Sequence, residues 1–237
     1  MQLIAALVLA VGVAAGGWFV GDGFRRGRES QRLVSVKGIA EREAKADLVL
    51  WPLRFVATGD ELPAVQTKSR ADADAIRRFL TGAGVPAEAI EVQGIEVTDV
   101  LANAYRSGPT ESRFIVAQTL MVRSTDVDRI AAASQRVGEL VDAGVVLSSE
   151  GGGAGPYYLF TKLNDVKPAM IAEATKRARE GAEQFAADSG SRVGGIHRAS
   201  QGLFQILARD DTPGTTEQRQ IAKTVRVVST VDYLLVH

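Results

Sequence analysis

The residues best suited to acid–base, nucleophilic or metal chemistry are few in this sequence. It has two histidines, His197 and His237, and no cysteine. A hydrolytic triad needs a base beside a nucleophile and an orienting acid, and a zinc site needs three or four converging ligands. His197 falls inside a predicted strand with no second histidine beside it, and His237 is the last residue. We therefore expect His197 to be structural, and we predict no catalytic residue, no metal site and no cofactor.

Two pairs of neighbouring carboxylates offer a second kind of chemistry. They are Glu41 with Glu43 and Asp210 with Asp211. Two carboxylates divide acid and base roles only where an apolar pocket or a close partner shifts one pKa. Both pairs lie in polar segments, where solvated carboxylates are the usual outcome. We therefore predict that the protein is not an enzyme.

One alternative keeps a ligand-binding or carboxylate-based enzymatic function open. It requires a deep pocket lined by several of Asp47, Glu150, Tyr157 and Tyr158, with a shifted pKa among them. The glycine-rich run at residues 151–155 resembles a phosphate-binding loop, but no Gly-Lys-Ser/Thr completes it and a proline and a strand follow. We interpret this run as a flexible connection or a bulge.

A long amphipathic helix is predicted between residues 163 and 190. Asn164 or Asp165 can cap its first turn, Pro168 is tolerated near the start, and Gly190 ends it in the left-handed conformation. An apolar stripe at three- and four-residue spacing is expected to pack on a β-sheet. The stripe consists of Ile171, Ala174, Ala178, Ala182 and Phe185.

Strand and helix patterns alternate through the rest of the chain. Strands are expected at 33–38 and 46–59, with the polar residues 39–46 between them and a register change at Trp51-Pro52. A helix over 60–82 precedes a hairpin, whose strands at 90–101 and 114–124 flank a tip at 102–113, and a second helix covers 127–141. After the long helix come two strands around a turn-rich segment at 209–218. This order predicts an α+β fold of antiparallel hairpins interleaved with three amphipathic helices packed on sheet.

The N-terminal residues predict one transmembrane helix in addition. Residues 3–20 carry no charge, close to the ~20 apolar residues that a bilayer-spanning helix needs. We expect residues 1–22 to form a membrane anchor or an uncleaved signal and 23–32 a basic linker. The anchor residues are Leu3, Leu7, Val11, Trp18 and Phe19. Cleavage near residues 14–17 and burial as a core helix are the alternatives.

The flanking charges give conflicting indications of orientation. Arg25, Arg26, Arg28 and Arg32 follow the hydrophobic run, so the positive-inside rule places the following domain in the cytoplasm. Basic residues upstream of Met1 would reverse this count. We interpret these arginines as a stop-transfer flank, with binding of anionic lipid headgroups as the alternative. The formal net charge of zero argues against a nucleic-acid partner.

Three aromatic residues form a candidate interface. Tyr157, Tyr158 and Phe160 lie close together in a predicted strand. Core packing is the default explanation for them, and a contact between subunits is the alternative.

From residue 33 to the C-terminus the sequence resembles the SIMPL-domain family. Val34-Ser35-Val36-Lys37-Gly38 opens this region, and the alanine-rich helix with Gly190, Val193 and Gly194 carries the stronger similarity. The chain departs from the family's Gly-x-Gly opening and Pro-Asp pair at residues 38–40 and 45–47. The similarity of the remaining motifs nevertheless predicts one SIMPL-like domain over residues 33–237.

The resemblance implies a bacterial envelope protein whose domain lies in the periplasm beside the inner membrane. It also implies ring-like or channel-like oligomers and a link to oxidative stress. We accordingly expect a non-enzymatic protein that contacts the lipid bilayer and forms a homo-oligomer. Two long apolar strands near the C-terminus, whose edges must be covered, favour assembly. An adaptor that binds another protein through the 102–113 tip remains a further alternative.

Overall fold

The computed structural model describes residues 12, 14–21, 32–102, 111–149, 155–210 and 212–236. The chain divides into two compact units, each built from separate stretches of sequence. The first, which we call the α5 unit, comprises Met1–Ala40, Ile171–Leu203 and Val227–His237. The second, the α2 unit, comprises Glu41–Met170 and Phe204–Arg226. Each unit has its own hydrophobic core.

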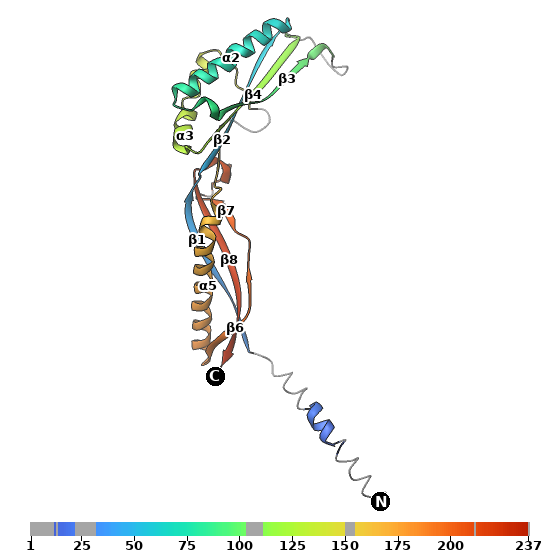
Figure 1. Ribbon diagram of the computed structural model, residues 1–237, viewed down its shortest axis with the longest axis vertical. Helices are drawn as coiled ribbons and strands as arrows, with labels where there is room; N and C mark the ends of the chain where they lie inside the picture. Colours follow the sequence, from blue (N-terminus) through green and yellow to red (C-terminus); the bar gives the residue numbers. More distant parts are fainter. Residues whose placement is uncertain are drawn as a thin grey trace, which may run out of the picture. The chain divides into compact units, whose positions relative to one another are not determined.

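The α2 unit contains an antiparallel sheet of four strands in the order β3-β4-β2-β5. These are β2 (Leu48–Gly59), β3 (Ile90–Asp99), β4 (Phe114–Ser124) and β5 (Tyr157–Leu159). The predicted hairpin is confirmed, because β3 pairs with β4 from Ile90↔Val122 to Asp99↔Phe114. Most of its tip, residues 103–110, lies outside the described residues. Helix α2 (Leu62–Gly82) lies along one face of the sheet (Figure 1).

Large apolar side chains fill the core between α2 and this sheet. Alternate residues of β2, Trp51, Leu53 and Phe55, point to the helix side and are at most 3% exposed. Ile76 and Leu80 of α2 meet them and are fully buried. The period of two in the strand and the three- and four-residue spacing in the helix therefore bury one face of each element.

The register change predicted at Trp51-Pro52 is wrong. β2 pairs with β4 without interruption from Val49↔Ser124 to Gly59↔Phe114. β2 is an inner strand of its sheet, but Pro52 lies at a local gap in the strand pairing. On the side away from β4, β2 pairs with β5 only up to Leu50↔Tyr157 and is bridged again only at Phe55↔Leu147. Pro52 lies between these two contacts, where its missing N–H leaves no donor unsatisfied.

The helix predicted over 127–141 is two short helices, α3 (Val127–Gln135) and α4 (Gly138–Asp142). Asp126 caps α3 by accepting a 3.1 Å hydrogen bond from the Arg129 N–H. Helix α3 ends before Arg136, whose N–H donates to the carbonyl three residues earlier, that of Ala133, at 3.0 Å. Ile130, Ala133 and Leu140 of the predicted apolar spacing are buried, but Val141, which belongs to the same spacing, is 58% exposed. The spacing thus identified the buried face but not the break.

The α5 unit contains most of helix α5 and most of the second antiparallel sheet, whereas β7 (Gln205–Ala208) of that sheet lies within the α2 unit (Figure 1). That sheet has the order β1-β8-β6, with β7 also pairing with β8. Its elements are β1 (Leu33–Lys45), β6 (Arg192–Gln201), β7 (Gln205–Ala208), β8 (Ala222–Val236) and α5 (Leu163–Asp188). β1, β8 and α5 contribute residues to both units. The strand predicted over 193–208 is divided between β6 and β7 at residues 202–204.

Small residues bring α5 very close to β1. A Cβ at Gly38 would lie 1.8 Å from the Ala174 carbonyl oxygen and 2.5 Å from the Ala178 nitrogen. Ala174, Ala178 and Ala182 of the predicted stripe are fully buried, Ile171 is half-buried, and Ala186, which was not in that stripe, is 2% exposed. Phe185, which was expected in that stripe, is 61% exposed. A four-residue repeat of alanines is buried, and Phe185 lies beside it.

The polar segment 39–46 was predicted to separate two strands, and this is wrong. β1 runs to Lys45, and its buried residues Val36, Gly38 and Ala40 follow the strand period of two. Glu41, Arg42 and Glu43 continue it as an exposed stretch. At the end of α5, Gly190 has φ of +64°, and the Ser191 N–H bonds to the Ala186 carbonyl at 2.8 Å, which confirms the predicted glycine stop.

The predicted membrane segment lies mostly outside the described residues. Leu3, Leu7 and Val11 are among these, and so is the linker apart from Arg32. Residues 14–21 are helical, and the side chains of Trp18 and Phe19 are 73% and 77% exposed. Within the described part of the chain, no helix has the length and apolar character needed to cross a bilayer.

Candidate functional site

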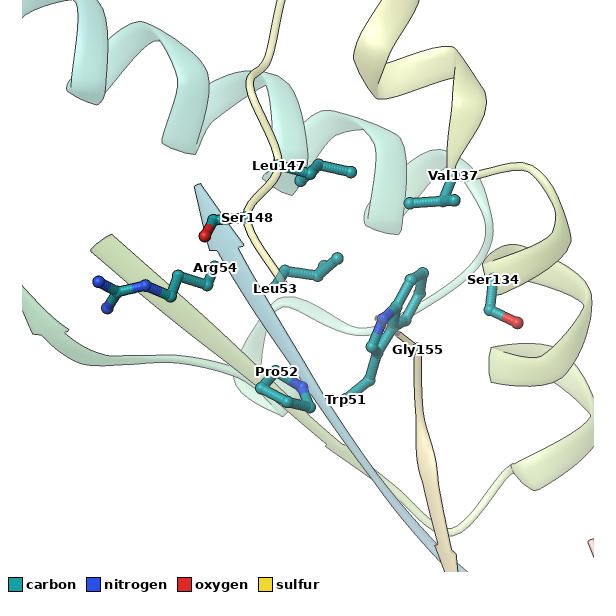
Figure 2. Close-up of a pocket in the computed structure, with 9 residues that line it drawn as sticks. All are labelled: Trp51, Pro52, Leu53, Arg54, Ser134, Val137, Leu147, Ser148 and Gly155. Atoms are coloured by element: carbon teal, nitrogen blue, oxygen red, sulfur yellow. The ribbon is translucent and has the colours of Figure 1, made fainter. Parts of the chain in front are cut away.

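An apolar pocket of about 220 Å³ lies within the α2 unit. Figure 2 shows residues of β2 on one side of it and the α3–α4 region on another, with the 147–148 segment and Gly155 completing the wall. The lining consists of Trp51, Pro52, Leu53, Arg54, Ser134, Val137, Leu147, Ser148 and Gly155. Trp51, Leu53, Val137 and Leu147 give it a mainly hydrocarbon surface.

The gap in strand pairing around Pro52 explains why a pocket forms here. The Val56 N–H bonds to the Val146 carbonyl at 2.9 Å, and the Ser148 N–H bonds to the Arg54 carbonyl at 2.8 Å. On the other side of Pro52, β5 ends its pairing at Tyr157. The pocket therefore opens where neither neighbour continues along β2. Proline at this position prevents a further strand residue from closing the gap with a ladder hydrogen bond.

Hydroxyl groups are the main polar groups on the pocket wall. The Ser134 hydroxyl donates a 2.8 Å hydrogen bond to the Ala131 carbonyl and is also hydrogen-bonded to the Tyr158 hydroxyl. Burial raises the pKa of Tyr158, although the Ser134 hydrogen bond and the charge of Arg219 act in the opposite direction. Tyr158 is therefore a neutral phenol at physiological pH and supports the pocket wall from behind.

Arg54 is the charged residue among the nine that line the pocket. Figure 2 shows its guanidinium directed away from the other lining side chains. Its Nη2 lies 3.3 Å from Oε2 of Glu96 on β3. The other eight lining residues carry no charged or histidine side chain, so the pocket matches a small neutral apolar molecule rather than an acid–base reaction.

Arg219 fixes the rim of the pocket at Gly155. It lies in η3 (Glu217–Arg219), and its Nη1 donates to the carbonyls of Gly155 at 2.8 Å and Pro156 at 3.2 Å. Its guanidinium also lies 4.2 Å from the centre of the Tyr157 ring. Gly155 has φ of +110°, which favours glycine there. Arg219 was not predicted, because nothing local in the sequence links it to a residue so far away in the chain.

A buried lysine in turn holds η3 in place. Lys223 on β8 has a fully buried side chain, and its Nζ lies 2.5 Å from both the carbonyl oxygen and Oε1 of Glu217. A buried ammonium requires such a partner, because desolvation of an unpaired charge is costly. Lys223, Glu217 and Arg219 therefore form a chain of contacts that ends at the pocket rim.

Asp47, Tyr157 and Tyr158, the described residues of the predicted carboxylate pocket, do not line the apolar pocket. Asp47 accepts hydrogen bonds from the N–H of Thr161 at 2.6 Å and from its hydroxyl at 2.7 Å. Burial alone would raise the pKa of Asp47, but these hydrogen bonds and the charge of Lys162 lower it overall. Asp47 thus remains ionised and tethers the chain after β5. Glu150 lies outside the described residues.

The other predicted chemical groups are separate and exposed. Glu41 forms an ion pair with Arg226 at 3.3 Å, and Asp210 forms one with Arg209 at 2.8 Å. His197 is an exposed residue of β6. Asp211, His237 and the glycine-rich residues 151–154 lie outside the described residues. In the described ranges, no group of three or more histidine, aspartate or glutamate residues could hold a metal ion.

The three aromatic residues of the predicted interface occupy different surroundings. Tyr158 is 7% exposed and belongs to the core of the α2 unit, as the packing alternative states. Tyr157 is half-buried beneath Arg219, and Phe160 is half-buried. The interface role of Tyr157 and Phe160 stays a prediction.

Two antiparallel sheets together with several helices define an α+β fold. The chain belongs to the SIMPL family, described as a protein of unknown function (DUF541), which matches residues 34–232. The match spans both units, in agreement with the resemblance found in the sequence. No match was found among curated proteins.

Proposed function

We propose that this SIMPL-family protein is a non-enzymatic component of the bacterial envelope that acts by assembling with copies of itself. The observation that carries this proposal is the exposure of two edge strands. β3 and β6 each have ten residues, lie at the outer edge of their sheets and are exposed along nearly their whole length. An uncovered strand edge presents unpaired N–H and C=O groups to another chain.

A membrane anchor at residues 1–22 is the second part of the proposal. The charge-free run of residues 3–20 and the arginines that follow it support an anchor, and a basic linker at 23–32 then leads into the family domain. A single anchor holds the chains in one membrane plane, which raises their local concentration and favours weak contacts between them.

The absence of enzymatic activity rests on the surroundings of the ionisable groups. Asp47, Glu41 and Asp210 are each engaged by a neighbouring hydroxyl or arginine. The described pocket has an apolar lining instead of paired acids. These contacts hold the three carboxylates in place within the fold, so we infer no acid–base role for them.

Size measurement on the full-length protein tests self-assembly. Detergent-solubilised protein should show a mass several times that of the 25.2 kDa chain over a wide concentration range. Monomers throughout that range would exclude the proposal. Deletion of residues 102–113 separates it from the adaptor alternative, which predicts loss of a partner protein while the oligomer remains.

The periplasmic location is proposed from the family resemblance, although the arginines after the hydrophobic run favour the cytoplasm. A reporter that is active only after export, fused to the C-terminus, decides between the two. Activity of this fusion supports the periplasmic domain, whereas activity of a matched cytoplasmic reporter excludes it.

The apolar pocket favours a second candidate function, binding of a small neutral ligand. Trp51 lines it, and Trp18 is the chain's other tryptophan. A Trp18→Phe variant therefore leaves one fluorescent reporter at the pocket. Saturable quenching by a small apolar probe such as benzene supports this function, and unsaturable quenching that matches free tryptophan excludes it.

A further inference from the structure

A second hollow, of about 210 Å³, lies over strands β2, β3 and β4 of the α2 unit. Arg54 alternates along β2 with Leu53 and Phe55, which face α2, so its side chain leaves the other face of the sheet. Figure 2 shows its guanidinium directed away from the apolar pocket. We call this second space the Arg54 hollow. Its lining consists of Arg54, Gln93, Gly94, Ile95, Glu96, Ala117 and Thr119.

Small residues and a bulge create the space beside Arg54. Arg54 lies opposite Thr119, and Glu96 lies opposite Ala117, so these four side chains share one face of the sheet. β3 has a bulge just before Gly94, and a Cβ at Gly94 would meet no other atom within 4 Å. The hollow therefore lies between two long charged side chains, above a floor of short ones.

The Arg54 guanidinium uses only part of its hydrogen-bonding edge. Its Nη2 lies 3.3 Å from Oε2 of Glu96, a single long contact with a side chain that is 67% exposed. Its Nε is buried and has no hydrogen-bond partner within the described part of the chain. Nε and Nη2 lie on the same edge of a guanidinium, and this edge can bind one carboxylate through two hydrogen bonds. A carboxylate that replaces Glu96 at Nη2 would therefore also reach Nε.

Arg113, at the start of β4, shows the same edge fully used. Its Nε lies 3.3 Å from both carboxylate oxygens of Asp99, and its Nη2 lies 3.0 Å from Oδ2. Asp99 thus contacts both nitrogens, whereas Glu96 contacts one. An added carboxylate would gain a second hydrogen bond at Arg54 but not at Arg113.

The charges of the Arg54 hollow select the kind of ligand. Arg54 and Glu96 are the two charged residues of its lining, and they have opposite signs. A simple anion would be attracted by Arg54 and repelled by Glu96. A molecule that carries both a carboxylate and an ammonium group would instead replace one ion pair with two.

We propose that the Arg54 hollow binds a small zwitterion, a free α-amino acid. The carboxylate lies on Nε and Nη2 of Arg54, and the ammonium group lies on the carboxylate of Glu96. The Thr119 hydroxyl and the Gln93 amide offer further hydrogen-bonding groups in the same lining. This binding site is independent of the proposed self-assembly.

The size of the hollow restricts the amino acid to one with a short side chain. Sites for drug-sized ligands measure roughly 300–1,000 Å³, and this hollow measures about 210 Å³. Glycine and alanine are therefore the probes of choice.

Ligand-observed NMR titration of the full-length protein in detergent tests the ligand class. We expect saturable binding of glycine and alanine at millimolar concentration. Acetate and methylammonium should each bind at least about tenfold more weakly, because each makes one of the two charged contacts. Unsaturable signals for both amino acids would overturn the site. Acetate that binds as tightly as glycine would overturn the zwitterionic ligand.

Matched variants test the residues. Arg54→Lys keeps the charge but lacks the two-nitrogen edge, so it should weaken glycine binding about tenfold. Arg113→Lys is the control and should leave glycine binding unchanged. Glu96→Gln should weaken glycine binding but strengthen acetate binding, because the repelling charge is removed.

Unfolding curves of these three variants show that each is folded before titration. Full glycine binding by Arg54→Lys, or an equal loss in Arg113→Lys, would overturn the assignment to Arg54. Weaker acetate binding by Glu96→Gln would overturn the role of Glu96 and, with it, the zwitterionic ligand.

Discussion

The two units of this protein build their cores in opposite ways. In the α2 unit, Trp51, Phe55, Ile76 and Leu120 fill the space between helix and sheet with large side chains. In the α5 unit, alanines of α5 lie directly against Gly38 of β1, and Tyr233 is the largest residue of the core. The α2 core depends on large side chains that fill space, and the α5 core depends on small residues that allow the helix and the strand to lie close together.

This difference predicts opposite sensitivities to mutation. A core of large side chains is damaged when atoms are removed, because the remaining structure collapses only partly around the cavity. A close helix–strand contact is damaged when atoms are added, because backbone atoms cannot rotate out of the way as side chains can. We therefore expect the α2 core to be sensitive to truncation of side chains, and the α5–β1 contact to be sensitive to their enlargement.

The largest effect is expected for Phe55→Ala in the α2 unit. Phe55 is fully buried, so its truncation should lower the free energy of unfolding by about 4 kcal/mol. Phe185→Ala is the control, since this phenylalanine is 61% exposed on α5 and its loss should cost less than about 0.5 kcal/mol. Chemical denaturation of the full-length protein measures both. Equal costs for the two would contradict the account of the α2 core.

Gly38→Ala should be nearly as damaging in the α5 unit although it adds one carbon. The new Cβ would overlap the Ala174 carbonyl, so we expect a loss of about 3 kcal/mol and faster hydrogen exchange in β1 and α5. Gly181→Ala adds the same carbon on α5, where its nearest neighbour is Val36 Cγ1 at 3.9 Å. It should instead stabilise by about 0.5 kcal/mol. If Gly38→Ala changed the free energy of unfolding as little as Gly181→Ala, α5 would be free to move away from β1.

Lys223→Ala tests the buried charge that supports the pocket rim. Its removal leaves Glu217 without a cationic partner and a cavity in the fold. Because the Glu217 side chain is 28% exposed, we expect a cost of about 2 kcal/mol, below that of a fully buried pair. Increased exchange at Gly155 and Tyr157 should accompany it. Unchanged exchange there would disconnect Lys223 from the rim.

Sequence periodicity predicted the α5 unit well, because its signals are local. The alanine repeat, the Gly190 stop and the start of the strand after it are readable from neighbouring residues, although the break at residues 202–204 was not predicted. The continuation of β1 through Glu41–Glu43 was missed because exposed strand residues are as polar as loop residues. The small buried residues Val36, Gly38 and Ala40, at every second position, were the signal available.

The pocket could not be predicted in the same way. Its rim joins Arg219 to Gly155, and its wall joins Ser134 to Tyr158, and neither pair has a spacing that marks a contact. Pro52 was expected to change the register of β2, whereas the gap beside it depends on where β5 and the 146–148 segment stop. Long-range geometry of this kind is decided by packing, which a local pattern does not contain.

The smallest effect is expected for Thr161→Val, which removes one of the two hydrogen bonds from Thr161 to Asp47. The variant should lose about 1 kcal/mol at pH 7. The pKa of Asp47 is lower in the folded state than in the unfolded chain, so its hydrogen bonds contribute fully above the unfolded pKa of about 3.9. That contribution is lost as pH falls through the folded value.

The difference between wild type and Thr161→Val should therefore shrink steadily below about pH 4, as unfolding curves over a pH series would show. Thr175→Val in the α5 unit is the matched control. The Thr175 hydroxyl donates to the neutral Ile171 carbonyl at 2.9 Å, so the effect of its loss should not change over this pH range. A pH-independent effect of Thr161→Val would mean that the hydroxyl does not stabilise the Asp47 carboxylate. The tether after β5 would then depend on the Thr161 backbone N–H alone.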